Sequence, residues 1–205
     1  MAVDTKTAVL DRTVAGRIDP RVTRTRKLLQ DAFISLLGEK GFQAMSVQDI
    51  AERATVNRAT FYAHFQDKYD MFDQMAGDTF RQSFSSRISA DSPLTQANLK
   101  LLIVTVFETL AQINDHCKPV GRELNPLIEA KAQAEIKAFL LTWLGRQPGV
   151  LADRREMRQV AATVMSWGIF GAGIEWSRGA RDRSAEEVAH QVLGLLAGGL
   201  SGALE

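Results

Sequence analysis

One short stretch of the 205-residue chain, SVQDIAERATVNRATFYAHFQDK from Ser46 to Lys68, carries its most distinctive side-chain chemistry. It combines hydroxyls, an aromatic ring and cations at positions that a helix core does not require. Arginine can donate two hydrogen bonds to guanine, an amide can bind a base edge, and an alanine methyl can contact thymine. Hydroxyls and lysine bind phosphate without reading sequence. Such side chains would face solvent or a ligand, and each residue alone also suits an ordinary solvent-exposed surface.

A short helix at the start of this stretch would position the first of these side chains. Ser46 followed three residues later by Asp49 is a capping-box pattern that starts a helix. Apolar residues with helical spacing follow it, namely Val47, Ile50, Ala51 and Ala54. We therefore predict a short helix that ends just before Thr55.

A second short helix would carry the remaining polar groups. Asn57 can cap it, and Phe61 and Phe65 are spaced to face the core. Its length of about two and a half turns is too small for stability in isolation, so the two rings must brace it. Two such helices around a turn, with a third behind, form a helix-turn-helix, whose second helix can enter the major groove. The free N–H groups at its N-terminal end would also suit a phosphate.

The longer stretch FQAMSVQDIAERATVNRATFYAHFQDKYDMF resembles the DNA-binding signature of the tetracycline-repressor (TetR) family of bacterial transcription regulators. The resemblance spans roughly Arg24 to Met75, and its most specific part is the TFYxHFxxK string. On this basis we expect DNA contacts from Ser46, Gln48, Asn57, Arg58, Ala59, Thr60, Tyr62, His64 and Lys68. The resemblance implies that Tyr62, His64 and Lys68 contact phosphates.

The turn between the two short helices departs from this family pattern. Thr55 stands where many family members have glycine. A β-branched residue is costly wherever the backbone needs a positive φ angle. We therefore expect a slightly different turn here, with the rest of the signature in register.

The remainder of the chain predicts an all-α fold, because cap residues and helix-period stripes recur while strand-like alternation is nearly absent. Asp19-Pro20 is expected to begin the first helix and Gly41 to end it, and Asp67 to begin a fourth helix that runs to about Ile88. Longer helices are expected over about 93–116, 126–146, 153–178 and 184–204. CKPVGRELN, between the first two of these, is expected to be a short helix or an irregular link.

We predict three segments within this organisation. They are a flexible basic arm at 1–18, a helix-turn-helix DNA-binding domain at 19–66, and a C-terminal ligand-binding and dimerisation domain at 67–205. The net charge is only +1, yet Met1 to Lys27 holds seven basic and three acidic residues, an excess of four positive charges. Such an arm can approach a phosphate backbone, or it can be a solvated tail.

Composition indicates an ordinary soluble globular protein, with 45% apolar and 24% charged residues. The single cysteine, Cys117, excludes an intrachain disulfide. The chain starts without an apolar signal core, and its apolar runs fall short of the roughly 20 residues that span a bilayer. We therefore expect a cytoplasmic location and no membrane partner.

The helix expected at 93–116 is apolar nearly all round, which places it at the centre of the C-terminal domain. Helices around a void commonly form a small-molecule pocket. Candidate pocket residues are Phe84, Phe107, His116, Cys117, Trp143 and Met165, each of which can alternatively be plain core. The His116-Cys117 pair could suggest a metal or thiol switch, but no further His or Cys clusters with it, so no cofactor or metal is expected.

The last two expected helices contain SWGIFGAGIEW and VLGLLAGGLSGAL, which mix bulky apolar residues with many glycines. Each helical glycine costs up to about 1 kcal/mol relative to alanine, which implies close approach of another backbone. The family resemblance implies that both helices pair with their copies in a four-helix dimer interface. The expected interface residues are Val164, Trp167, Gly168, Gly171, Ile174, Val188, Val192, Leu195, Leu196 and Gly199. Alternatively, the two helices close the monomer's own core.

These expectations combine into one function, a TetR-like transcriptional regulator. We expect a homodimeric repressor that binds a palindromic operator in double-stranded DNA and is released by an unidentified small-molecule effector. Enzymes are disfavoured, because the sequence lacks a GxxxxGK[ST] loop, an HExxH motif and a GxSxG elbow. A helical protein-interaction scaffold without sequence-specific DNA binding is the alternative, and DNA binding at physiological salt discriminates between the two.

Overall fold

The structure, a computed structural model, describes residues 19–117, 125–147 and 154–201. Within these ranges every regular element is a helix, which confirms the predicted all-α class. The helices are α1 Pro20–Ala44, α2 Val47–Arg53, α3 Arg58–His64, α4 Lys68–Arg87, α5 Gln96–Cys117, α6 Asn125–Arg146, α8 Arg155–Arg178 and α9 Ala185–Ser201. The predicted arm at 1–18 and most of the CKPVGRELN segment lie outside the described residues.

Helix starts follow the capping residues that the sequence predicts. Asp19 Oδ1 accepts a hydrogen bond of 2.8 Å from the Arg21 amide, and Pro20 is the first residue of α1. Asp67 Oδ1 accepts from the amides of Tyr69 and Asp70, both at 2.8 Å, and so starts α4.

Two boundaries show the same local control. Gly41 adopts a φ of 77°, which breaks the helical geometry near the end of α1 as expected. Helix α5 begins at Gln96, three residues after the predicted Pro93, because the Thr95 hydroxyl accepts a hydrogen bond of 3.1 Å from the Asn98 amide and acts as the cap.

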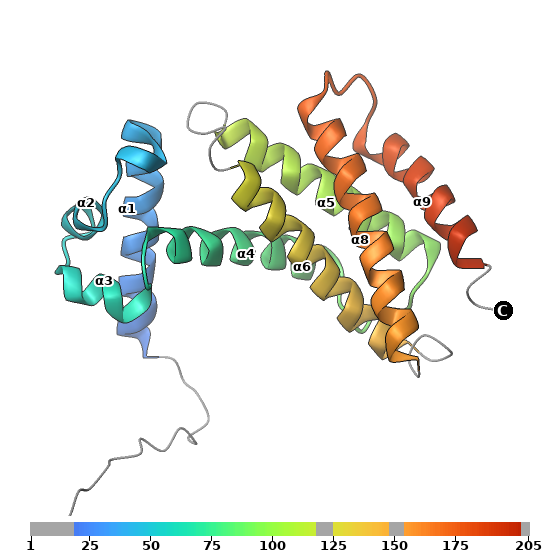
Figure 1. Cartoon of the computed structure of the whole chain (residues 1–205), viewed down its shortest axis with the longest axis horizontal. Helices are drawn as coiled ribbons and strands as arrows, with labels where there is room; N and C mark the ends of the chain where they lie inside the picture. The colour runs from blue at the N-terminus through green and yellow to red at the C-terminus, as the bar shows by residue number, and fades with distance from the viewer. Residues whose placement is uncertain (1–18, 118–124, 148–153, 202–205) are drawn as a thin grey trace, which may run out of the picture.

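The described residues form two hydrophobic clusters that α4 connects (Figure 1). The N-terminal cluster packs α1, α2 and α3 against the first turns of α4, including Met71 and Phe72, and against Ile128 of α6. The larger cluster includes Phe80 and Phe84 further along α4 and fills the bundle of α5, α6, α8 and α9. Since α4 contributes to both clusters, the predicted domain boundary at residue 67 stays a prediction.

Helix α5 is the central helix of the bundle, as its apolar surface predicts. Leu102, Ile103, Val106 and Phe107 are fully buried, and α5 lies against α4, α8 and α9. Helix α9 begins behind Ser184, whose hydroxyl accepts from the Glu187 amide at 3.2 Å. None of the described helices combines the length and apolarity that a membrane span needs.

Candidate nucleic-acid interface

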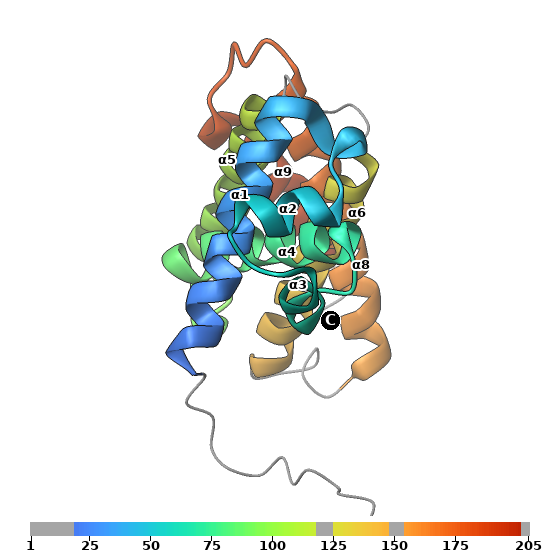
Figure 2. The same ribbon diagram turned by 90° about the vertical axis from the view of Figure 1, so that its left-hand side faces the viewer.

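Helix α3 lies on the outer face of the N-terminal unit, on the side away from the bundle (Figures 1 and 2). Phe61 and Phe65 point inward with 0% and 2% exposure, and their ring centroids are 5.7 Å apart. Asn57 Oδ1 accepts a hydrogen bond of 2.7 Å from the Thr60 amide and caps the helix. The short helix is therefore held from behind and from its N-terminal end, while its opposite side is open to solvent.

Arg58 and Tyr62 form a pair on this open side. The guanidinium donates to the Tyr62 hydroxyl, with Nη2 at 2.9 Å and Nε at 3.3 Å, and lies 5.4 Å from the ring centroid. The Tyr62 side chain is 47% exposed, and Arg58 and Ala59 are exposed beside it. A cation, a phenol and a methyl group therefore share one exposed side of a single helix, and the major groove, about 12 Å wide, admits one helix.

Other predicted DNA-contacting residues lie around α3 with local partners. The Thr60 hydroxyl donates to Asn57 Oδ1 at 2.9 Å, so both side chains contribute to the cap. The Ser46 hydroxyl belongs to the capping box of α2, and Gln48 Nε2 donates to Glu52 Oε1 at 2.6 Å. Asn57, Ser46 and Gln48 remain exposed, so their predicted DNA contacts stay predictions.

The two predicted phosphate-contacting residues that follow Tyr62, His64 and Lys68, differ from it in environment. His64 is half-buried, with its ring centroid 6.2 Å from that of Phe65. The Lys68 ammonium donates to the carbonyl oxygens of Phe42, Gln43 and Met45 at 2.9, 3.3 and 2.8 Å. An ammonium has three N–H donors, so these carbonyls at the end of α1 use all of them. The structure thus gives Lys68 a helix-capping role, and its expected phosphate contact stays a prediction.

The turn before α3 keeps the conformation that glycine favours, contrary to the expectation of an altered turn. Thr55 has a φ of 58°, in the left-handed region. The Val56 amide donates to Ala51 O at 2.9 Å and the Thr55 amide to Glu52 O at 3.0 Å. This pair of bonds is the Schellman motif, which requires a left-handed residue after the helix. The helix ending therefore determines the backbone at Thr55, at a steric cost to its branched side chain.

Ion pairs that the sequence analysis did not identify hold α2 on α1. Arg53 donates to both carboxylate oxygens of Glu39, at 2.6 and 2.7 Å, and Lys40 lies 2.8 Å from Asp49. Hydrogen bonds from Arg53 and then Ser35 lower the pKa of Glu39 to about 2. Hydrogen bonds from Lys40 and then Ser46 lower the pKa of Asp49. These bonds fix the helix that precedes the recognition turn.

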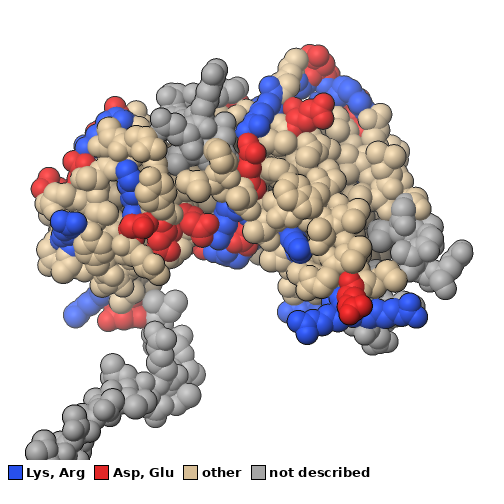
Figure 3. Space-filling model, viewed as in Figure 1, with Lys and Arg blue, Asp and Glu red and all other residues tan. Residues whose placement is uncertain are grey.

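A second group of charged residues joins the N-terminal unit to the bundle, where acidic and basic side chains interleave along α4 (Figure 3). Arg26 of α1 donates to Gln74 of α4 at 2.8 Å, and its guanidinium lies 4.8 Å from the Phe65 ring centroid. Further along α4, Arg81 contacts Glu135 of α6 at 2.5 Å. Phe65, which supports α3 from behind, therefore contacts Arg26 of α1, and polar contacts join α1 to α4 and α4 to α6.

The residues predicted to line a ligand pocket are mostly core. Phe84, Phe107, Trp143 and Met165 are at most 2% exposed and belong to the bundle cluster. Trp143 Nε1 donates to Ser92 O at 2.6 Å, which satisfies its one donor. The side chains of His116 and Cys117 lie outside the described residues. Phe84 differs from the other three because it also lines a surface groove of about 440 Å³ between α4 and α6.

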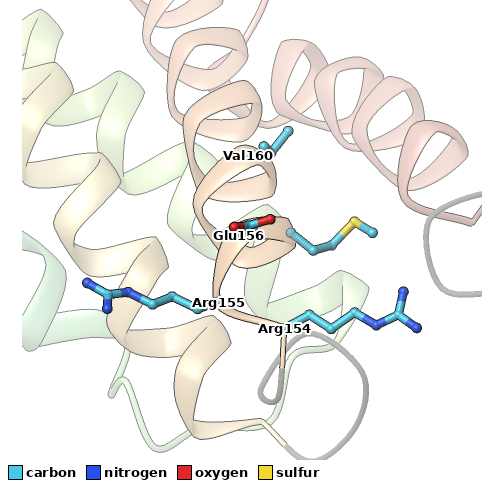
Figure 4. A pocket seen from close by; sticks show the side chains of 5 residues that line it. Arg154, Arg155, Glu156 and Val160 are labelled. Atoms are coloured by element: carbon cyan, nitrogen blue, oxygen red, sulfur yellow. The ribbon is translucent and has the colours of Figure 1, made fainter.

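A second hollow, of about 560 Å³, lies at the start of α8. The described residues that line it are Arg154, which directly precedes α8, and residues of the first turns of that helix, including Arg155, Glu156 and Val160 (Figure 4). The side chains of Arg154 and Arg155 point in opposite directions, so their positive charges do not converge on one ligand position. This hollow therefore supports no specific anion site.

The predicted dimer-interface residues divide into two groups. Val164, Trp167 and Leu195 are 60%, 56% and 79% exposed, and a Cβ added at Gly171 would have no neighbour within 4 Å. Gly168 is also exposed on this face, where a Cβ would meet only Leu196. The half-buried members, which pack partly on the bundle's own core, are Ile174, Val188, Val192 and Leu196. Gly199 belongs to α9, but its exposure lies outside the described part of the structure.

Comparison with known families gives a match over the helix-turn-helix and the start of α4. The family described as "Bacterial regulatory proteins, tetR family" matches residues 29–75. The uncharacterized HTH-type transcriptional regulator YxbF of Bacillus subtilis is 33% identical over 84 residues, 40% of this chain and 22% of that protein. The HTH-type transcriptional repressor KstR2 of Rhodococcus jostii is 30% identical over 87 residues, 42% of this chain and 43% of that protein. The match thus spans less than half of each relative.

Solved structures share the fold over most of the chain. A TetR transcriptional regulator from Streptococcus agalactiae aligns over 86% of this chain and 95% of its own, with a TM-score of 0.56 and 18% identity. A transcriptional regulator from Pseudomonas aeruginosa aligns over 91% of this chain and 93% of its own, with a TM-score of 0.53 and 19% identity. At these identities the comparison concerns the fold, including the bundle beyond residue 75.

Proposed function

We propose that this chain, which belongs to the TetR family of helix-turn-helix transcriptional regulators, binds a palindromic operator as a homodimer and represses transcription until a small molecule releases it. The observation that carries the proposal is the position of α3. Its apolar side is buried by Phe61 and Phe65, and the opposite side presents Arg58, Ala59 and Tyr62 to solvent. A helix held in this way can enter a major groove without rearrangement of the domain.

The proposed roles of these side chains follow from their chemistry. Arg58 is proposed to bind guanine O6 and N7, Gln48 to bind a base edge, and Ala59 to contact a thymine methyl. The proposed phosphate contacts come from the Tyr62 hydroxyl and from His64. The Ser46 and Thr60 hydroxyls are proposed to exchange their bonds to Asp49 and Asn57 for bonds to phosphate. Lys68 is proposed to support this surface from α4 through the end of α1.

The dimer is proposed on a separate observation, the outer face of α8. No charged residue occurs from Gln159 to Ile174, and the surface over the middle of α8 is free of charge (Figure 3). Val160, Val164 and Trp167 are each more than half exposed on this helix. Burying such a face against a second copy would remove apolar area from water. It would also supply the second recognition helix that a palindrome requires, about 34 to 36 Å from the first.

Release by a ligand requires two states of the dimer with different affinities for DNA. The coupling cannot exceed the difference in the ligand's affinity for those states. Helix α4 is the proposed connection, because it contributes to both hydrophobic clusters. A change at its bundle end would alter the orientation of the N-terminal unit and therefore the spacing of the two α3 helices.

Selection of genomic DNA fragments bound by the purified full chain tests the proposed operator. We expect enrichment of an inverted repeat, and fluorescence anisotropy should give tighter binding to it than to a scrambled duplex at physiological salt. The absence of any sequence preference would contradict the proposal and favour a helical interaction scaffold. Transcription from the selected promoter with and without the protein then tests repression.

A further inference from the structure

Of the expected pocket residues, Phe107, Trp143 and Met165 are buried in the bundle core, whereas Phe84 lines a hollow between α4 and α6. The side chains of Lys131 and Glu135 of α6 reach over Gly77 of α4. A Cβ added there would lie 2.5 Å from Lys131 Cε and 2.8 Å from Glu135 Oε1. Further along both helices lies the groove of about 440 Å³, a volume in the range of small-molecule sites.

Aromatic rings and short apolar side chains form the walls of this groove. Phe84 of α4 and Phe139 of α6 meet edge to face, with ring centroids 5.5 Å apart. Ile88, which directly follows α4, and Ala138 of α6 add apolar surface. Phe84 and Ile88 are 2% and 4% exposed, so the walls are set in the bundle core. These walls favour an occupant that is largely apolar and carries a ring.

The charged groups at the edge of the groove already have partners. Arg81 pairs with Asp78 at 2.6 Å and with Glu135 at 2.5 Å. Glu135, whose side chain is 12% exposed, also lies 3.4 Å from Lys131, which in turn pairs with Asp73. A charged occupant that displaced Arg81 or Lys131 from Glu135 would leave a mostly buried carboxylate without its partner. An uncharged occupant would not.

The polar groups at the edge offer acceptors. The Thr142 hydroxyl donates to Ala138 O at 3.0 Å, and the Ser85 hydroxyl donates to Gln82 O at 3.3 Å. Each hydroxyl has a single hydrogen, so what remains on each oxygen is lone-pair capacity. Both residues line the groove. They therefore match an occupant that donates a hydrogen bond.

We infer that the groove between α4 and α6 is the effector site of the proposed regulator, and that its effector is an uncharged, ring-containing, largely apolar molecule with an O–H or N–H donor. The inference rests on the proposed function. Arg81 and Glu135 line the groove and also join α4 to α6, so an occupant contacts the ion pair that holds the connecting helix. This contact gives the occupant different affinities for different positions of α4.

Isothermal titration calorimetry of the full chain tests the site with two probes of matched shape, para-phenylphenol and para-phenylbenzoate. We expect the phenol to bind and the carboxylate to bind at least about tenfold more weakly. Ala138→Phe fills the groove from an exposed position and should weaken phenol binding at least about tenfold. Ala130→Phe, at an exposed alanine of α6 outside the groove, should leave it unchanged.

Failure to bind the phenol, equal binding by the wild type and Ala138→Phe, or tighter binding of the carboxylate would overturn the inference. Thermal melts of both variants verify their folding. Operator binding without any probe is measured in parallel on the wild type. If the wild type does not bind the operator, the proposed regulator is refuted. The calorimetric comparison would still decide whether the groove binds uncharged ring compounds.

Discussion

At the scale of single residues, the open side of α3 holds its cation in a defined position. The Arg58 guanidinium is bound to the Tyr62 hydroxyl and lies over its ring, so it is oriented by its own helix. A guanidinium oriented in advance loses less side-chain freedom when it binds guanine. Arg58 is therefore the residue of α3 for which a base-specific contact is the most direct prediction.

Arg58→Ala should cost about 1 to 3 kcal/mol of operator affinity and relax the preference at one base pair. The reason is the loss of a bidentate contact that only one base can satisfy. Anisotropy titrations of the operator and of single-mismatch duplexes measure both effects. Arg154→Ala, at the exposed arginine that directly precedes α8, is the control and should leave both unchanged. An equal loss of affinity for every duplex would show that Arg58 makes no base-specific contact.

Lys68 allows a test between a structural role and a phosphate contact. Lys68→Met keeps a long apolar stem but removes the donors to three carbonyls, which should lower the free energy of unfolding by about 1 to 3 kcal/mol. Urea denaturation measures this change, with Lys27→Met at an exposed position of α1 as the control. The salt dependence of DNA binding should keep its slope. A slope reduced by about 1 with unchanged stability would instead indicate a phosphate contact.

At the scale of elements, the helix starts were predictable because their capping interactions span two or three residues. Asp19, Ser46, Asn57 and Asp67 each bond an amide in the following turn. The same locality applies to Phe61 and Phe65, whose spacing alone predicts that they share the buried side of α3.

Contacts between elements were less accessible to sequence reasoning. Arg53 and Glu39 are 14 positions apart, and Arg81 and Glu135 are 54 apart, so their pairing depends on how the helices pack. Large apolar residues such as Phe107 and Trp143 fit a pocket or a core equally well, and the structure buries both. The groove between α4 and α6 likewise depends on the approach of two helices that no local pattern describes.

In the turn after α2, Thr55 has a positive φ angle that is unfavourable for a β-branched residue. Thr55→Gly should raise the free energy of unfolding by about 0.5 to 1 kcal/mol, because relief of the left-handed strain exceeds the entropy that glycine adds to the unfolded chain. Chemical denaturation measures the change. Thr79→Gly, at an exposed position inside α4, should have the opposite sign, with a loss of up to about 1 kcal/mol. Destabilisation by Thr55→Gly would show that the threonine side chain contributes contacts that outweigh the strain.

At the scale of the whole molecule, one chain presents one recognition helix, and a palindrome needs two. The outer face of α8 combines exposed Val164 and Trp167 with Gly168 and Gly171, which leave room for a second backbone. Helix α9 adds Leu195, which is 79% exposed. An apolar face of this kind is costly in a monomer and is typical of a subunit interface.

Trp167→Glu should convert the expected dimer to a monomer and thereby lose operator binding, because the substitution would bury an unpaired charge between two copies of α8. The fold of the chain should persist, since Trp167 is 56% exposed within one subunit. Sedimentation velocity at micromolar concentration and thermal melting separate the two effects. Leu127→Glu, at an apolar residue of α6 that is 41% exposed, is the matched control and should remain dimeric. A wild-type chain that sediments as a monomer would contradict the proposed interface. DNA binding by Trp167→Glu at wild-type affinity would show that operator recognition does not depend on this interface.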